Sequence, residues 1–255
     1  MSTTHTQIST QVPVALPDPR DTYAQDEEWF VARIDGRWRQ IRFHDYADIY
    51  KVPGLYERLF YEILECDSPA TIRAMIAEAI EEVDGPVDDL RALDLGGGNG
   101  IMGEELRALG AEVVVGSDII PEAAMAAERD RPGVYTDYVV ADMSALDDEV
   151  VTDLSQWRFN CLTCVAALGF GDIPPEAFRG AYELLEEDAL VGFNINENFL
   201  DGADRSGFSE MIANAIEDGT LEIVNRRRYQ HRVGTDRQPI HYIGMVGVKR
   251  GELAS

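Results

Sequence analysis

The chain has 255 residues, of which 45% are hydrophobic, and it carries 22 Lys and Arg against 47 Asp and Glu, a formal net charge of −25. A chain of this length and composition can bury a large core, which excludes a wholly disordered protein and favours one α/β domain with an appendage. The negative charge argues against a protein that binds nucleic acid or an anionic membrane, because phosphate-binding surfaces are basic.

The first 21 residues are rich in Ser, Thr, Gln and Pro, and they lack the basic start and apolar run of a secretory signal. We expect residues 1–21 to form a mobile arm. The chain also lacks the run of about 18 apolar residues that a membrane span needs. The sequence therefore predicts a cytoplasmic location.

Residues 22–88 predict a helical cap that is unusually rich in tyrosine. From Trp29 to Val83 the apolar and aromatic residues follow a helical pattern. Ser68-Pro69 is typical of a helix start, and Gly85-Pro86 of a helix end.

Residues 89–255 alternate short β-rich runs with amphipathic helices, a pattern that predicts a parallel sheet built from βαβ units. The last two strands are separated by a short polar turn and predict an antiparallel hairpin added to that sheet. The predicted strands cover residues 91–95, 112–117, 138–141, 159–167, 190–195, 221–230 and 240–248, and the predicted helices cover 100–109, 121–129, 147–153, 174–186 and 207–218.

Cys161 and Cys164 form a C-x-x-C motif that could indicate metal or redox chemistry. They lie in a predicted buried strand, where residues three apart point to opposite faces of the sheet. We therefore predict two core cysteines and no metal site, since no second pair completes a zinc site.

The strongest motif is the glycine-rich segment Leu93–Gly100, in which an apolar strand leads into a turn that opens a helix. Such a helix start offers free N–H groups and the positive end of a dipole. Asp118 ends the second strand, where a carboxylate can accept from a ribose diol. Asp142 and Met143 follow the third strand and could contact an adenine. The same glycines also satisfy the G-x-G-x-x-G dinucleotide pattern through Gly103, which leaves a nicotinamide cofactor as an alternative.

Together these motifs resemble the class I S-adenosylmethionine-dependent methyltransferases over about residues 88–250. The resemblance implies a seven-stranded, mostly parallel sheet of order 3-2-1-4-5-7-6, with the last strand antiparallel and helices on both faces. It also implies S-adenosylmethionine as the cofactor and S-adenosylhomocysteine as the product.

The resemblance assigns cofactor roles residue by residue. Asp94 and the glycines of the turn would hold the methionine moiety, Asp118 the ribose, and Ile119, Asp142 and Met143 the adenine. Val165 belongs to the motif that lines the transfer cleft, and an N-terminal tyrosine would cover the cofactor carboxylate. The expected cofactor-binding residues are thus Tyr46, Tyr50, Asp94, Gly96, Gly98, Gly100, Asp118, Ile119, Asp142, Met143 and Val165.

A hydroxyl or amine acceptor could need a base to remove its proton, and histidine is the usual choice. His44 lies in the predicted cap, and His241 and His231 flank the final hairpin turn. Asn196 follows the fifth strand of the predicted sheet and could bind an acceptor hydroxyl or amine. Each residue has a plain alternative: the histidines as surface residues and Asn196 as a turn residue. Tyr46 and Tyr50 could likewise simply pack the cap.

We therefore predict a methyltransferase that acts on the oxygen, nitrogen or carbon of a small molecule in a cleft covered by the cap. The alternatives are an S-adenosylmethionine-binding enzyme with a non-methylation reaction, such as cyclisation or another alkyl transfer, an NAD-dependent oxidoreductase, and a cofactor-binding regulator. The expected partner is a small molecule, without nucleic acid or membrane, and a homodimer is left open.

Overall fold

The computed structural model describes residues 12–82, 89–168, 172–199 and 207–254. Several predicted features lie outside these residues: the first half of the arm, with His5, the helix end at Gly85-Pro86, and the end of the motif around residues 165–171.

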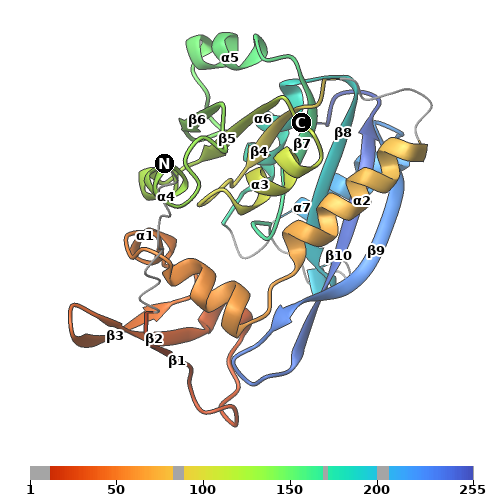
Figure 1. The fold of residues 1–255 in the computed structure, drawn as a ribbon. Helices are drawn as coiled ribbons and strands as arrows, with labels where there is room; N and C mark the ends of the chain where they lie inside the picture. Colours follow the sequence, from red (N-terminus) through yellow and green to blue (C-terminus); the bar gives the residue numbers. More distant parts are fainter. Residues whose placement is uncertain (1–11, 83–88, 169–171, 200–206, 255) are drawn as a thin grey trace.

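A seven-stranded sheet forms the centre of the larger part of the molecule (Figure 1). Its order is β6-β5-β4-β7-β8-β10-β9; β10 is antiparallel to both of its neighbours, and the other four pairings are parallel. Strands β1 to β3 belong to a second sheet, so β4 is the first strand of this one. When the strands are numbered from β4, the order is 3-2-1-4-5-7-6. The strands are β4 (Arg91–Leu95), β5 (Val113–Asp118), β6 (Asp137–Val140), β7 (Phe159–Cys164), β8 (Leu185–Asn196), β9 (Leu221–Val233) and β10 (Pro239–Lys249).

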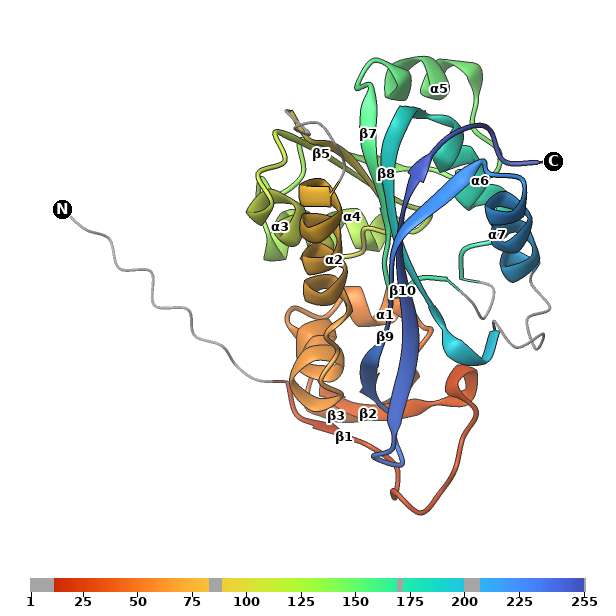
Figure 2. The ribbon, with the colours of Figure 1, turned by 90° about the vertical axis from the view of Figure 1, so that its right-hand side faces the viewer.

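Helices cover both faces of this sheet, with α2 and α3 on one side and α6 and α7 on the other (Figure 2). Cys161 is buried in the cluster under α2 and α3, and Cys164 in the cluster under α6 and α7, which confirms the prediction of two core cysteines on opposite faces. The helices are α2 (Ser68–Glu82), α3 (Ile101–Ala108), α4 (Pro121–Asp130), α5 (Asp148–Ser155), α6 (Pro175–Glu183) and α7 (Phe208–Glu217).

A separate N-terminal layer, residues 12–67, packs beside the carboxyl ends of the central strands (Figure 1). It begins with a three-stranded antiparallel sheet and continues into helical turns. Its elements are β1 (Val14–Ala15), η1 (Gln25–Glu27), β2 (Trp29–Ile34), β3 (Arg37–Arg42), α1 (Tyr46–Tyr50) and the π-helix η2 (Glu57–Ile63).

The prediction of an all-helical cap is wrong for residues 29–42, which form the hairpin β2–β3. Asp35 and Gly36 both have positive φ angles, 51° and 77°, as a two-residue hairpin turn of this kind requires. Phe30 and Ala32 are buried while their strand neighbours are less so, the alternation typical of a strand. Val14–Ala15 pair with β2, so this part of the predicted arm belongs to a sheet.

Helix α2 belongs to the central domain and not to the N-terminal layer. Ile72, Met75 and Ile76 are fully buried in the cluster that α2 forms with the sheet. A Cβ at Gly192 would lie 2.9 Å from Ile76, and one at Gly244 would lie 2.9 Å from Met75. These two glycines let α2 lie close against β8 and β10.

The end of the β9–β10 hairpin joins the two parts of the molecule. Arg232 of β9 forms an ion pair with Glu28, and both side chains are buried. The backbone N–H of Val233 donates to the Leu64 carbonyl at 2.8 Å. Among the described residues, every helix is too short or too polar to cross a lipid bilayer.

Candidate functional site

A cavity of about 500 Å³ lies where β4, β5, β6 and β7 end, and the N-terminal layer forms its opposite wall. Ligands of open α/β sheets bind at this edge. The cavity is lined from the sheet side by residues 95–96, 117–120, 141–143, 165–167, 172–174 and 177, and from the N-terminal layer by residues 44–48, 50 and 56.

The glycine turn after β4 is shaped by close contacts on both sides. Gly96 has φ 72° and lines the cavity, and a Cβ there would lie 3.0 Å from Ala167 and Ile173. Gly98 has φ 51°, and a Cβ there would overlap the Tyr50 hydroxyl. Gly100, at the start of α3, faces Val134 instead. Only Gly96 of the three predicted glycines therefore borders the cavity, and Gly98 makes room for Tyr50.

Asp94 lies beneath this turn and does not line the cavity. It is 1% exposed, and it accepts hydrogen bonds from the Tyr135 hydroxyl at 2.7 Å and the Thr163 hydroxyl at 2.8 Å. Burial raises the pKa of its carboxyl to about 6, although both hydrogen bonds act in the opposite direction. Tyr135 also lies 3.0 Å from the Gly97 carbonyl, so Asp94 and Tyr135 together support the turn.

Polar groups at the end of β5 face the cavity. Asp118 accepts from the Gly98 N–H at 3.3 Å and the Ile120 N–H at 3.1 Å, and burial raises the pKa of its carboxyl. The buried Ser117 hydroxyl, which also lines the cavity, has no hydrogen-bond partner among the described residues. Ile119, next to them, is 61% exposed. A ligand in the cavity could satisfy Ser117 and cover Ile119.

Asp142 and Met143 line the cavity at the end of β6. The Ser144 hydroxyl and N–H donate to Asp142 at 2.6 and 2.9 Å, which holds the pKa of that carboxyl below its usual value. Val165, after β7, also borders the cavity. The structure thus brings Gly96, Asp118, Ile119, Asp142, Met143 and Val165 together, as the sequence predicts.

The wall from the N-terminal layer is aromatic. The rings of Tyr46 and Tyr50 are stacked with centroids 6.2 Å apart, and the ring centroids of Tyr50 and Tyr56 are 5.1 Å apart. His44 Nδ1 lies 2.8 Å from Asp172 Oδ2, which links this wall to the segment after β7. Asp172 is a site residue that the sequence patterns did not single out, although it follows a predicted core strand, as the other cavity residues of the sheet side do.

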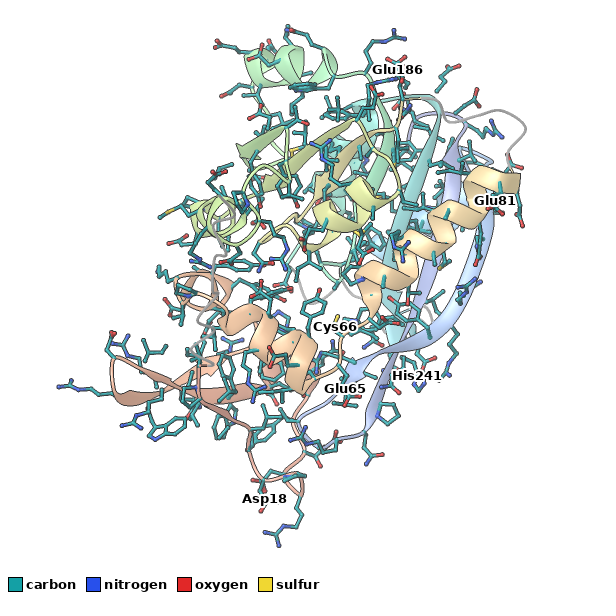
Figure 3. All side chains as sticks on the ribbon, in the orientation of Figure 1. Asp18, Glu65, Cys66, Glu81, Glu186 and His241 are labelled. Carbon is teal, nitrogen blue, oxygen red and sulfur yellow. The ribbon has the colours of Figure 1, made fainter. Side chains whose placement is uncertain are left out.

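His241 and Asn196 do not reach this cavity. They line a separate depression where β8 ends and β10 begins. There Asn196 donates to the Gln25 side chain at 2.7 Å, and His241 Nδ1 lies 3.9 Å from Glu197 Oε1. Figure 3 shows His241 on β10. The reason is strand length: β8 continues through Asn196, where it still pairs with Tyr242, and this carries both residues past the cavity.

His231 lies inside the protein. It is 5% exposed, stacks on Tyr242 and lies 2.7 Å from the Ser68 hydroxyl. Burial lowers the pKa of its imidazole well below the usual value, so the ring is neutral near pH 7. Cys66, labelled in Figure 3, is 3.8 Å from the same ring.

A small inner chamber of about 30 Å³ adjoins the main cavity and shares five of its residues. The shared residues are His44, Tyr46, Tyr56, Ala166 and Asp172, and the far side includes His231, Arg232 and Tyr242. The His44–Asp172 pair therefore lies at the junction of the two spaces. Within the described residues, no group of three or more His, Cys, Asp or Glu side chains is placed to hold a metal ion.

The sequence matches the family model of the methyltransferase domain over residues 55–227. The fold is similar to the N-methyltransferase NodS from Bradyrhizobium japonicum WM9, solved with S-adenosyl-L-homocysteine, at 12% identity and a TM-score of 0.55, over 82% of this chain and 98% of that one. It is also similar to an S-adenosylmethionine-dependent methyltransferase from Clostridium acetobutylicum, at 15% identity and a TM-score of 0.53, over 77% and 97% of the two chains. A search of curated proteins found no match.

Proposed function

Because the chain belongs to the methyltransferase-domain family and S-adenosylmethionine is its cofactor, we propose that it methylates a small molecule inside the main cavity. The acceptor would enter between the N-terminal layer and the ends of the central strands. The observation that carries this proposal is that one cavity is lined by the cofactor motifs on one side and by α1 on the other.

The residues at the sheet side of the cavity fit the cofactor. Asp118 presents carboxylate oxygens at the end of β5, where a ribose diol can donate to them. The unpartnered Ser117 hydroxyl offers a further hydrogen bond, and Gly96 brings the turn after β4 to the edge of the cavity. Asp142 and Met143 would meet the adenine, one through a hydrogen bond and the other through packing.

S-adenosylmethionine supplies an electrophilic methyl group on a sulfonium. What remains for the protein is to align the acceptor and to exclude water, since most of the gain in such a displacement comes from proximity and orientation. Tyr46, Tyr50 and Tyr56 supply the apolar wall for this purpose, and the cavity is of the size that small-molecule sites have.

The test is calorimetric titration of one preparation with S-adenosylmethionine, S-adenosylhomocysteine and NAD. We expect both sulfur compounds to bind and NAD not to bind. Binding of NAD alone would favour the oxidoreductase alternative, and binding of none by a folded sample would refute the proposal.

The reaction type needs a second measurement, a screen of small acceptors followed by detection of S-adenosylhomocysteine and a product heavier by one methyl group. Consumption of an acceptor without S-adenosylhomocysteine would instead favour a non-methylation reaction of the bound sulfonium.

A further inference from the structure

The main cavity is strongly acidic. Five aspartates line it, and no Lys or Arg is among its described lining residues. Lys51 lies outside, 3.3 Å from Asp48 and 3.5 Å from Glu122. The five are Asp45, Asp48, Asp118, Asp142 and Asp172.

Not all of these carboxylates are available to an acceptor. Under the proposed function, Asp118 and Asp142 face the cofactor, and Asp48 is paired with Lys51. Asp45, at the start of α1, and Asp172, which reaches His44 from the sheet side, remain where the acceptor would bind. Asp45 accepts the Arg42 N–H at 3.0 Å, and Asp172 lies against His44. The nearby cation Arg232, which lines the inner chamber, is already paired with Glu28. The acceptor side therefore favours a positively charged ligand over a neutral or negative one.

The aromatic wall also favours a positively charged ligand. Tyr46, Tyr50 and Tyr56 all line the cavity, and the faces of aromatic rings attract ammonium groups when water is excluded. Carboxylates that lie beside such rings discriminate further between an ammonium and an uncharged hydroxyl.

We propose that the acceptor is an amine, which binds as an ammonium ion between the tyrosine wall and the carboxylates of Asp45 and Asp172, and that His44 removes its proton. This inference rests on the proposed function and deepens it. His44 is the proton acceptor, and Asp172 has two roles: its carboxylate attracts the ammonium, and its contact with Nδ1 positions the His44 ring.

The proton transfer precedes the displacement, because an ammonium nitrogen has no lone pair. In the tautomer that donates Nδ1–H to Asp172, the lone pair of the neutral ring lies on Nε2. One ammonium proton moves to this nitrogen, and the Asp172 carboxylate stabilises the imidazolium. The amine lone pair then forms the N–C bond to the methyl group while the C–S bond breaks and its electrons stay on sulfur. The product leaves as the methylated ammonium.

The first test compares matched probes on enzyme saturated with S-adenosylhomocysteine: 2-phenylethylamine against 2-phenylethanol, and benzylamine against benzyl alcohol, measured by ligand-observed NMR near pH 7. We expect each amine to bind about tenfold more tightly than its alcohol. Asp172→Asn should remove most of this preference. Asp153→Asn, which removes one charge from the exposed face of α5, should leave it unchanged. Equal binding of amines and alcohols, or binding by no amine, overturns the proposal.

The second test separates the role of His44 from binding, using an amine from the same set that the enzyme methylates. His44→Gln should lower kcat by about 100-fold or more with little change in amine affinity, since a positioned base contributes on this scale. Asp172→Asn should lower kcat as well, and Asp172→Glu should restore part of it, which a loss of folding would not permit. The proposal is overturned if the enzyme methylates alcohols but no amines, or methylates neither. It is also overturned if His44→Gln leaves kcat unchanged.

Failure here is distinguishable from failure of the proposed function. An enzyme that binds S-adenosylmethionine but prefers alcohols refutes only the amine assignment. An enzyme that binds neither sulfur compound refutes the methyltransferase proposal, whichever probe it prefers.

Discussion

The two walls of the main cavity are built in different ways. On the sheet side, each residue sits within a few positions of the end of its own strand, as Gly96, Asp118 and Asp142 do. On the other side, the wall depends on contacts between distant parts of the chain: His44 meets Asp172, 128 residues away, and Glu28 meets Arg232, 204 residues away. Local sequence can specify the first wall, whereas the second depends on how the N-terminal layer docks.

Removal of the link between the two parts should have the largest effect on stability. Arg232→Met leaves the buried Glu28 carboxylate without its cation, which typically costs about 3–5 kcal/mol of unfolding free energy. Urea denaturation would measure it. Arg158→Met breaks an exposed pair with Glu186 and should cost no more than about 1 kcal/mol. A similar small loss in both variants would mean that docking does not depend on this pair.

Gly98→Val tests the point where the two walls touch. The new side chain would collide with the Tyr50 hydroxyl and push the turn and α1 apart, so we expect affinity for S-adenosylmethionine to fall more than about 100-fold. Gly110→Val is the matched control, because Gly110 also has a positive φ, 95°, but nothing lies within 4 Å of its Cβ position. Both variants carry backbone strain, and only the first should lose binding by calorimetry. Equal binding losses would attribute the effect to strain.

The pH dependence of the unfolding free energy tests the role of Asp94, which lies beneath the glycine turn on the sheet side of the cavity. Its pKa is about 6 in the folded protein, above the value of about 3.9 expected when unfolded. The folded state therefore binds this proton more tightly, and its contribution to stability falls as pH rises from about 4 to 6. Relative to Asp94→Asn, the wild type should lose about 2 kcal/mol between pH 4 and pH 7, measured by urea denaturation at both values. A difference between the two proteins that does not change with pH would contradict this account of Asp94.

Asp118→Asn should have a smaller effect, and on binding alone. Loss of its charge should weaken S-adenosylmethionine by about 1–3 kcal/mol, the usual range for a charge-assisted hydrogen bond. Asp153→Asn is again the control, and the melting temperatures of both variants should stay close to that of the wild type. Unchanged affinity in Asp118→Asn would place the ribose elsewhere in the cavity.

Sequence patterns predicted the central domain well, because its signals are local. The predicted strand at 91–95 coincides with β4, and the predicted helix at 121–129 begins where α4 begins and ends one residue before it. Prediction was poorer for the N-terminal layer. Asp35-Gly36 was a hairpin signal, yet the surrounding aromatic pattern favoured a helix. Asn196 and His241 were misplaced because a slightly longer β8 carries them past the cavity, and periodicity does not fix where a buried strand ends.

The contact between Tyr50 and Gly98 has an evolutionary consequence. The Tyr50 hydroxyl occupies the space that any side chain at position 98 would need, and its carbonyl also accepts from Arg129 at 2.8 Å, which holds α1 in place. The two positions therefore cannot diversify independently. Lineages that acquire a side chain at position 98 should carry a smaller residue at position 50. This covariation would link evolutionary changes in cofactor binding to changes in acceptor specificity.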